Sequence, residues 1–170
     1  MEGLQKLEIR KIVPTISRVS SGKSRLLNVL YNIKFLECRK DITTKFINLL
    51  RYNPNISNPC FYHLKIKKQG EDYIFYKDLS EIYIGEKDII EANKKINKKL
   101  SDTEEINYED IFYMIEINDS PFIKDKEYLL SHDLCDIPGL SEYQGIQIKE
   151  EENSDTLQDI KNCTNQKSKN

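Results

Sequence analysis

The chain has 170 residues, of which 38% are hydrophobic and 32% are charged, and its formal net charge is −2. This length suits one domain with a buried core and does not comfortably hold two. The composition is that of a water-soluble globular protein, and it excludes a general attraction to nucleic acid or to anionic lipid.

Cysteine usage and the N-terminus favour a cytoplasmic protein. The four cysteines are far apart, which excludes zinc-site spacing and a redox Cys-x-x-Cys motif. The N-terminus lacks the apolar run of a signal peptide, and no run of about eighteen apolar residues occurs. We therefore expect free thiols in a reducing compartment, with Cys60 and Cys135 packed as small hydrophobic side chains.

The first predicted elements are a buried strand at residues 12–16, a short loop that ends in Gly22-Lys23-Ser24, and a helix that reaches about residue 35. This order is typical of a phosphate-binding loop, in which backbone amides and a helix N-terminus face the phosphates. Lys23 is then expected to reach the β- and γ-phosphates, and the Ser24 hydroxyl to bind Mg²⁺.

Two details of this region weaken that interpretation, and an alternative competes with it. Ser17 stands where the full motif has its first glycine, which allows a sharp bend close to phosphate. Pro14 removes a hydrogen-bond donor from the strand. The alternative is an ordinary helix whose N-terminus is capped by Ser20 or Ser21.

The middle of the chain predicts a loop, a hairpin and a helix. Polar residues 39–45 lead into a strand at 46–50, and a turn with two prolines follows. Alternating residues at 60–68 and 72–78 predict a β-hairpin, with His63 on its exposed face. Residues 85–100 predict a charged helix with a thin apolar stripe, whose paired lysines we interpret as a solvated face rather than a nucleic-acid site.

A strong strand is predicted at residues 111–117, and another ends at Asp136. Asp136-Ile137-Pro138-Gly139 follows it. After a phosphate-binding loop, such a segment can hold a Mg²⁺-bound water through Asp136 and contact the γ-phosphate through the Gly139 amide. Alone, the segment favours a plain β-turn, but Gly22-Lys23-Ser24 in the same chain favours the nucleotide interpretation.

Together these segments resemble the GTPase domain of the dynamin superfamily of large GTPases, over about residues 8–145. The resemblance implies an α/β, P-loop NTPase-like G domain over residues 1–148, with a mixed, mostly parallel sheet flanked by helices. Residues 149–170 are expected to be a polar, weakly ordered tail. The segments that carry the resemblance are Ser20-Ser21-Gly22-Lys23-Ser24 with Leu26-Leu27-Asn28, Ile42-Thr43-Thr44-Lys45, and Asp136-Ile137-Pro138-Gly139.

The resemblance also implies Mg²⁺-dependent binding of GTP, with hydrolysis to GDP and phosphate left open. Self-association is a further expectation, and membrane association follows from the family likeness only. The implied catalytic residues are Ser20, Lys23 and Thr43, and the implied Mg²⁺ ligands are Ser24, Thr43 and Asp136. The implied nucleotide contacts are Ser20, Ser21, Gly22, Lys23, Ser24, Thr43, Thr44, Asp136 and Gly139.

Two departures from the family pattern bear on activity. Val19 stands where these proteins commonly carry a glutamine that orients the attacking water, so we expect slower hydrolysis. Residues 140–170 contain no Thr/Asn-Lys-x-Asp segment, which reads guanine in the family. A non-catalytic interaction module and a P-loop protein that uses ATP therefore remain alternatives.

The missing guanine-reading segment also implies a G domain that is incomplete on its C-terminal side. We expect such a sheet to have an unpaired edge. We further expect it to leave Ile115, Ile117 and Leu134 uncovered, which favours self-association.

Overall fold

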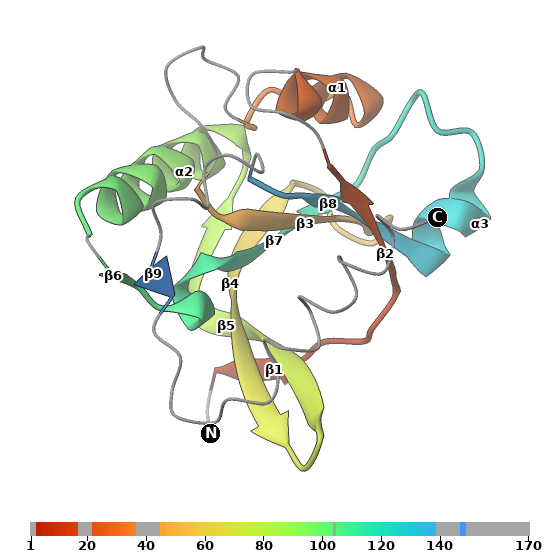
Figure 1. Ribbon diagram of the computed structural model, residues 1–170. Coiled ribbons are helices and arrows are strands. Elements are labelled where there is room, and N and C mark those ends of the chain that lie inside the picture. The colour runs from red at the N-terminus through yellow and green to blue at the C-terminus, as the bar shows by residue number, and fades with distance from the viewer. Residues whose placement is uncertain (1–2, 17–21, 37–44, 104, 139–146, 149–170) are drawn as a thin grey trace, which may run out of the picture.

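The structure is a computed structural model that describes residues 3–16, 22–36, 45–103, 105–138 and 147–148. Within these residues, one mixed sheet has seven strands in the order β1-β5-β4-β7-β3-β8-β2 (Figure 1). Its strands are β1 (Leu4–Lys6), β2 (Lys11–Thr15), β3 (Ile47–Tyr52), β4 (Cys60–Gln69), β5 (Asp72–Ile84), β7 (Phe112–Ile117) and β8 (His132–Asp136). The other elements are α1 (Lys23–Leu30), α2 (Glu86–Ser101), α3 (Lys126–Ser131), the short 3₁₀ helix η1 (Tyr108–Ile111), and the paired β6 (Glu105–Ile106) and β9 (Gln147–Ile148).

The sheet is mixed, as predicted, but the prediction that it is mostly parallel is wrong. Among the described strands, β2 runs parallel to β8 and β3 parallel to β7. The other four pairs in this sheet are antiparallel. The reason is local: the β4–β5 hairpin and its pairing with β1 and β7 add antiparallel strands to one side of the sheet.

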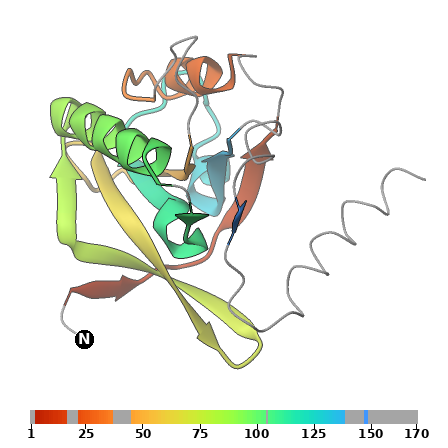
Figure 2. The same ribbon diagram turned by 60° about the vertical axis from the view of Figure 1, so that its left-hand side comes forward.

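The three α-helices all contribute to one face of the sheet. Leu27 of α1, Ile89 of α2 and Leu129 of α3 are fully buried in the larger apolar cluster, together with strand side chains of that face. Figure 2 shows α1 and α2 on the same side of the sheet. The opposite face holds a smaller cluster that includes Leu64 and Met114. The helices therefore flank one face, whereas the prediction left the face unspecified.

The apolar residues that were expected to be uncovered lie in the core. Ile115 is fully buried and Ile117 and Leu134 nearly so, because α1, α2 and α3 cover their face. That expectation is wrong. The exposed apolar side chains are scattered over several elements. They include Ile12 and Ile16 on and beside β2, which are 50% and 64% exposed, and others on α1, β5 and α3.

Strand β2 lies at the edge of the sheet as far as the structure describes it, and it pairs with β8 alone. A proline is tolerated in such a strand because one side of the strand has no partner there. This position accounts for Pro14, which made the strand prediction uncertain.

Helix α1 ends at Leu30, five residues before the predicted end. Asn32 has a left-handed backbone, with φ of 52°. The amide of Ile33 donates to the carbonyl of Asn28 at 2.8 Å, and that of Asn32 donates to Val29 at 3.1 Å. These two bonds form a Schellman motif, and asparagine is one of the few residues that adopt its left-handed position readily.

The predicted hairpin and the charged helix are confirmed as β4–β5 and α2. The second hairpin strand continues to Ile84, past a register irregularity between Tyr62 and Leu64. His63 does not lie on an exposed face, because its ring stacks on Tyr113 with centroids 4.9 Å apart. Within the described residues, no helix is both long enough and apolar enough to cross a membrane.

Candidate functional site

The N-terminus of α1 begins at a glycine. Gly22 is the N-cap residue and has a left-handed backbone with φ of 85°. A Cβ atom added there would meet no atom of the described residues within 4 Å, so it is the backbone conformation that favours glycine. The alternative in which Ser20 or Ser21 is the N-cap residue is thus wrong. The first turn contains no acidic residue of its own, so its positive dipole end has no carboxylate from within the helix.

Two predicted site residues of α1 contact the predicted site residue of β8. The Ser24 hydroxyl donates to Asp136 Oδ2 at 2.9 Å. Lys23 Nζ lies 3.4 Å from Asp136 Oδ1. Ser24 and Asp136 are 112 positions apart in the chain. The N-terminus of α1 and the end of β8 therefore meet at one place. Strand β2, which precedes α1 in the chain, is the parallel neighbour of β8, with Thr15 opposite Asp136.

Asp136 is a buried charge at this meeting point. Its side chain has no exposed surface, and that of Lys23 is 13% exposed. A carboxylate removed from water needs ionic or hydrogen-bonding partners, since an uncompensated buried charge is strongly destabilising. Lys23 and Ser24 supply such partners. The Lys23 ammonium group can exchange this carboxylate for a phosphate group, and the Ser24 hydroxyl can exchange it for a cation.

Two polar neighbours of Asp136 were not singled out from the sequence. Asn48 of β3 is directly opposite Asp136 in the antiparallel register and is 1% exposed. Its Oδ1 atom is buried without a hydrogen-bond partner among the described residues. On β2, the Thr15 hydroxyl donates to the carbonyl of Cys135 at 2.8 Å. The available signal was an asparagine inside the apolar run at 46–50, where strand propensity disfavours it.

Cys135 precedes Asp136 and is not suited to nucleophilic chemistry. Burial, with the charges of Asp136 and Asp133 as smaller causes, raises the pKa of its thiol to about 12. The thiolate is the reactive form of cysteine, so this thiol is inert near neutral pH. Cys135 and Cys60 are both buried and free, as expected.

The remaining predicted site residues lie outside the described residues. They are Ser20, Ser21, Thr43, Thr44 and Gly139. The structure thus brings together Gly22, Lys23, Ser24 and Asp136 and does not bear on the other five.

The described side chains fit a magnesium ion that is shared with a phosphate ligand. Mg²⁺ prefers oxygen ligands and commonly binds through one or two protein oxygens together with substrate phosphates and waters. The Ser24 hydroxyl and the Asp136 carboxylate place two such oxygens 2.9 Å apart. No cluster of three His, Cys, Asp or Glu residues that could hold a metal ion occurs in the described part of the chain, at this site included, so an ion here would depend on ligand oxygens and water.

Comparison with known proteins identifies the family of the chain. The model of the dynamin family matches residues 15–166, a span that begins at the last residue of β2 and includes α1 and β8. The chain belongs to the dynamin family. Searches of curated proteins and of solved structures gave no match. Dynamin-family membership therefore rests on the family model, together with an open mixed sheet that is consistent with a G domain.

Proposed function

We propose that this chain is a dynamin-family GTP-binding domain that binds GTP with Mg²⁺ between the N-terminus of α1 and the end of β8. The observation that carries the proposal is the contact of Lys23 and Ser24 with the buried carboxylate of Asp136. Helix α1 also presents an N-terminus without an acidic residue, which favours an anion at that position.

Lys23, Ser24 and Asp136 would each contact a different part of the ligand. Lys23 would turn from Asp136 to the phosphates, where an ammonium group stabilises negative charge. Ser24 and Asp136 would then hold Mg²⁺, with Asp136 acting through a bound water. When bound, Mg²⁺ would supply positive charge that offsets the negative charge of the phosphates. The ion pair with Lys23 thus keeps Asp136 compensated until the ligand arrives.

The other proposed roles follow from the family resemblance. We assign Ser20 and Ser21 to the phosphates, Thr43 to Mg²⁺ and the attacking water, and Thr44 and Gly139 to nucleotide contact. The choice of GTP over ATP rests on family membership, because the proposed site residues read phosphate rather than the base.

A direct test compares nucleotide binding by the wild-type chain and by Lys23→Ala. Fluorescently labelled GTP should bind the wild-type chain in the presence of Mg²⁺, and the variant should bind about 10- to 100-fold more weakly, as expected for a lost hydrogen bond to a charged group. Lys95→Ala is the matched control, because Lys95 lies on α2 in an exposed pair with Glu91 and is 66% exposed. Equal affinity of the two variants would contradict the proposed site.

Two further arms test the ligand itself. Unlabelled GTP should displace the labelled nucleotide at much lower concentration than ATP, and chelation of Mg²⁺ with EDTA should weaken binding. Displacement by ATP and GTP at equal concentrations would favour the alternative P-loop protein that uses ATP.

Hydrolysis is the second part of the proposal, and we propose that it is slow. The observation in favour is Val19, whose side chain cannot hydrogen-bond to the attacking water. Losing a group that orients a reactant slows catalysis by about a hundredfold. Phosphate release by the wild-type chain should therefore be low, and Val19→Gln should raise it while Lys23→Ala abolishes it. Equal release from all three proteins would leave a binding module without turnover.

A further inference from the structure

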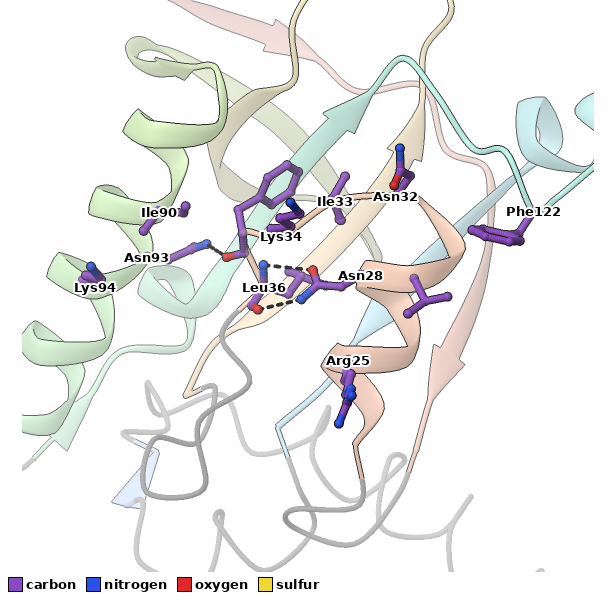
Figure 3. A pocket seen from close by; sticks show the side chains of 12 residues that line it. Arg25, Asn28, Asn32, Ile33, Lys34, Leu36, Ile90, Asn93, Lys94 and Phe122 are labelled. Carbon is purple, nitrogen blue, oxygen red and sulfur yellow. Dashed lines mark hydrogen bonds between the residues drawn. The ribbon is translucent and has the colours of Figure 1, made fainter.

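Asparagine side chains of two helices bind the backbone just before residues 37–44. Asn28 of α1 makes two hydrogen bonds with Leu36: Nδ2 donates to the carbonyl at 2.9 Å, and Oδ1 accepts from the amide at 3.1 Å. Asn93 of α2 donates to the carbonyl of Phe35 at 2.8 Å. Figure 3 shows both asparagines converging on this short stretch. The chain is therefore held from both helices where it enters residues 37–44.

A third asparagine binds the backbone just after the same residues. Oδ1 of Asn97 accepts from the amide of Lys45 at 3.3 Å. Asn97 lies four residues after Asn93 on α2, so both side chains are on one face of that helix. We call Asn28, Asn93 and Asn97 the asparagine clamp.

The asparagine clamp is not the arrangement that stability alone would favour. Asn93 and Asn97 are 3% and 6% exposed and lie in the buried face of α2 with Ile89, Ala92 and Leu100. The Oδ1 atom of Asn93 is buried with no hydrogen-bond partner among the described residues, which offsets part of what its bond to Phe35 contributes. A buried polar group with an unsatisfied atom calls for a reason other than packing.

The clamp also connects to the site described above. Asn28 follows Ser24 by four residues on α1, so the two side chains share one helical face. Thr43 is two residues before Lys45 in the sequence, and consecutive Cα atoms are about 3.8 Å apart. Thr43 therefore cannot lie more than about 8 Å from Lys45. Anchoring Lys45 on α2 and Leu36 on α1 restricts where Thr43 can be relative to Ser24.

We infer that the asparagine clamp consists of positioning residues, which hold both ends of the segment that carries Thr43 at a set place beside the nucleotide site. This inference rests on the proposed function, since Thr43 is assigned to Mg²⁺ and the attacking water only there. Each asparagine acts through the backbone and touches no reacting atom. Helix α2 contributes no residue to the proposed site. Through Asn93 and Asn97 it nevertheless affects nucleotide binding.

The test uses leucine substitutions, because leucine has the same branched skeleton of side-chain heavy atoms as asparagine, is not smaller, and makes no hydrogen bond. This choice matters since a cavity of about 600 Å³ borders Asn28 and Asn93, and a smaller side chain would enlarge it. Asn93→Leu and Asn97→Leu each remove one anchor, whereas Asn97→Asp keeps an acceptor oxygen. The matched control is Asn118→Leu, because Asn118 makes the same kind of contact elsewhere: it donates to the carbonyl of Ser57 at 3.1 Å.

The first measurement is cleavage by trypsin after Arg39 and Lys40 in the full chain without ligand, relative to cleavage after Lys67 and Lys68 in the hairpin. Loss of one anchoring hydrogen bond should speed relative cleavage about fivefold in both leucine variants of the clamp. Asn97→Asp and Asn118→Leu should be cleaved like the wild-type chain. Equal relative cleavage in all variants would overturn the inference.

The second measurement is the ratio of the affinities for a non-hydrolysable GTP analogue and for GDP. A clamp that positions Thr43 should favour the triphosphate, so this ratio should fall about fivefold in Asn93→Leu and Asn97→Leu and recover in Asn97→Asp. A uniform loss of affinity for both nucleotides would show a merely structural role and overturn the inference. If the wild-type chain binds no nucleotide, the proposed function fails and this inference with it, whereas unchanged cleavage overturns the inference alone.

Discussion

Strand β8 carries two buried aspartates, Asp133 and Asp136, that are held in opposite ways. They are 1% and 0% exposed and only three residues apart. Side chains alternate along a strand, so the two carboxylates lie on opposite faces of the sheet. Asp133 is near the start of β8, whereas Asp136 is its last residue.

Asp133 is held by arginines that also bind the backbone. Arg51 of β3 forms a bidentate contact with it, with Nη2–Oδ2 at 2.6 Å and Nε–Oδ1 at 3.0 Å, and also donates to the carbonyl of Glu8 at 2.8 Å. Arg10 lies 3.9 Å from the carboxylate and donates to the carbonyl of Tyr52. A planar guanidinium fork with several fixed acceptors is a rigid connection. This end of β8 joins the N-terminal segment to the sheet.

Asp136 is held by partners that can leave. Lys23 is a point charge on a flexible stem, and the Ser24 hydroxyl can rotate to a new acceptor. Both belong to the first turn of a helix that begins at a left-handed glycine. The comparison teaches that burial of a carboxylate alone does not identify a functional site. What favours the proposed site at Asp136 is that the partners of this carboxylate are exchangeable.

The largest expected effect is on stability at the Asp133 end. Asp133→Asn leaves the Arg51 guanidinium buried without a counter-charge, and breaking a buried pair in this way costs about 3–5 kcal/mol of unfolding free energy. Urea unfolding followed by circular dichroism measures it. The double variant Asp133→Leu with Arg51→Met should recover most of the loss, because apolar residues replace the whole pair. A single variant within about 1 kcal/mol of the wild-type chain would break the comparison.

The same substitution at Asp136 should have the opposite outcome. In Asp136→Asn the amide still accepts from Ser24, and Lys23 can extend to water, so the unfolding free energy should change by less than about 1 kcal/mol. The affinity for Mg²⁺ with GTP should fall about 10- to 100-fold, as for lost ligands of metal-bound water. Titration of labelled GTP at several Mg²⁺ concentrations measures this. An Asp136→Asn chain that unfolds while Asp133→Asn stays folded would reverse the assignment of the two ends.

The contrast also marks how much could be predicted from the sequence. Helix α1, the end of β8 and the main elements between them follow from local patterns, so their order could be predicted directly. The loop motif and the Asp-x-x-Gly motif pointed to Lys23 and Asp136, because a spacing of residue types is visible without a fold. The arginine pairing of Asp133 was not foreseen, since its partner is 82 residues away and no motif connects them.

The predictions that the structure contradicts failed for physical reasons of the same kind. Strand direction depends on which strands pair, and pairing of residues distant in sequence is not contained in local alternation. The end of α1 depends on a left-handed Asn32, which helical periodicity does not report. Asn48 and Asn97 drew no attention because asparagine in a strand or helix acquires meaning only from its tertiary partner.

The smallest expected effect concerns His63, which sharpens the comparison because it is ionisable and half-buried yet forms no ion pair among the described residues. Its Nε2 lies 2.9 Å from the carbonyl of Glu109 and its ring stacks on Tyr113. Burial lowers its pKa below the ordinary value, with Lys65 adding to the shift. The Glu109 carbonyl, Asp110 and Asp78 oppose it. Unlike the aspartates, this group is accommodated by remaining neutral.

The sign of the pH dependence follows from that lowered pKa. Between the ordinary pKa of 6.5 and the lower pKa of folded His63, the unfolded chain binds more protons than the folded chain. Above pH 6.5, neutral His63 therefore makes its full contribution to the unfolding free energy. This contribution is lost as the pH falls through the pKa of His63 in the folded state. His63→Gln keeps a donor for the Glu109 carbonyl but cannot titrate. Between pH 7 and pH 5 the variant should therefore lose less unfolding free energy than the wild-type chain. These two pH values lie on either side of the ordinary histidine pKa of about 6.5. Urea unfolding of both proteins at the two pH values measures the difference. Identical losses would mean that His63 is protonated as easily in the folded chain as in the unfolded one.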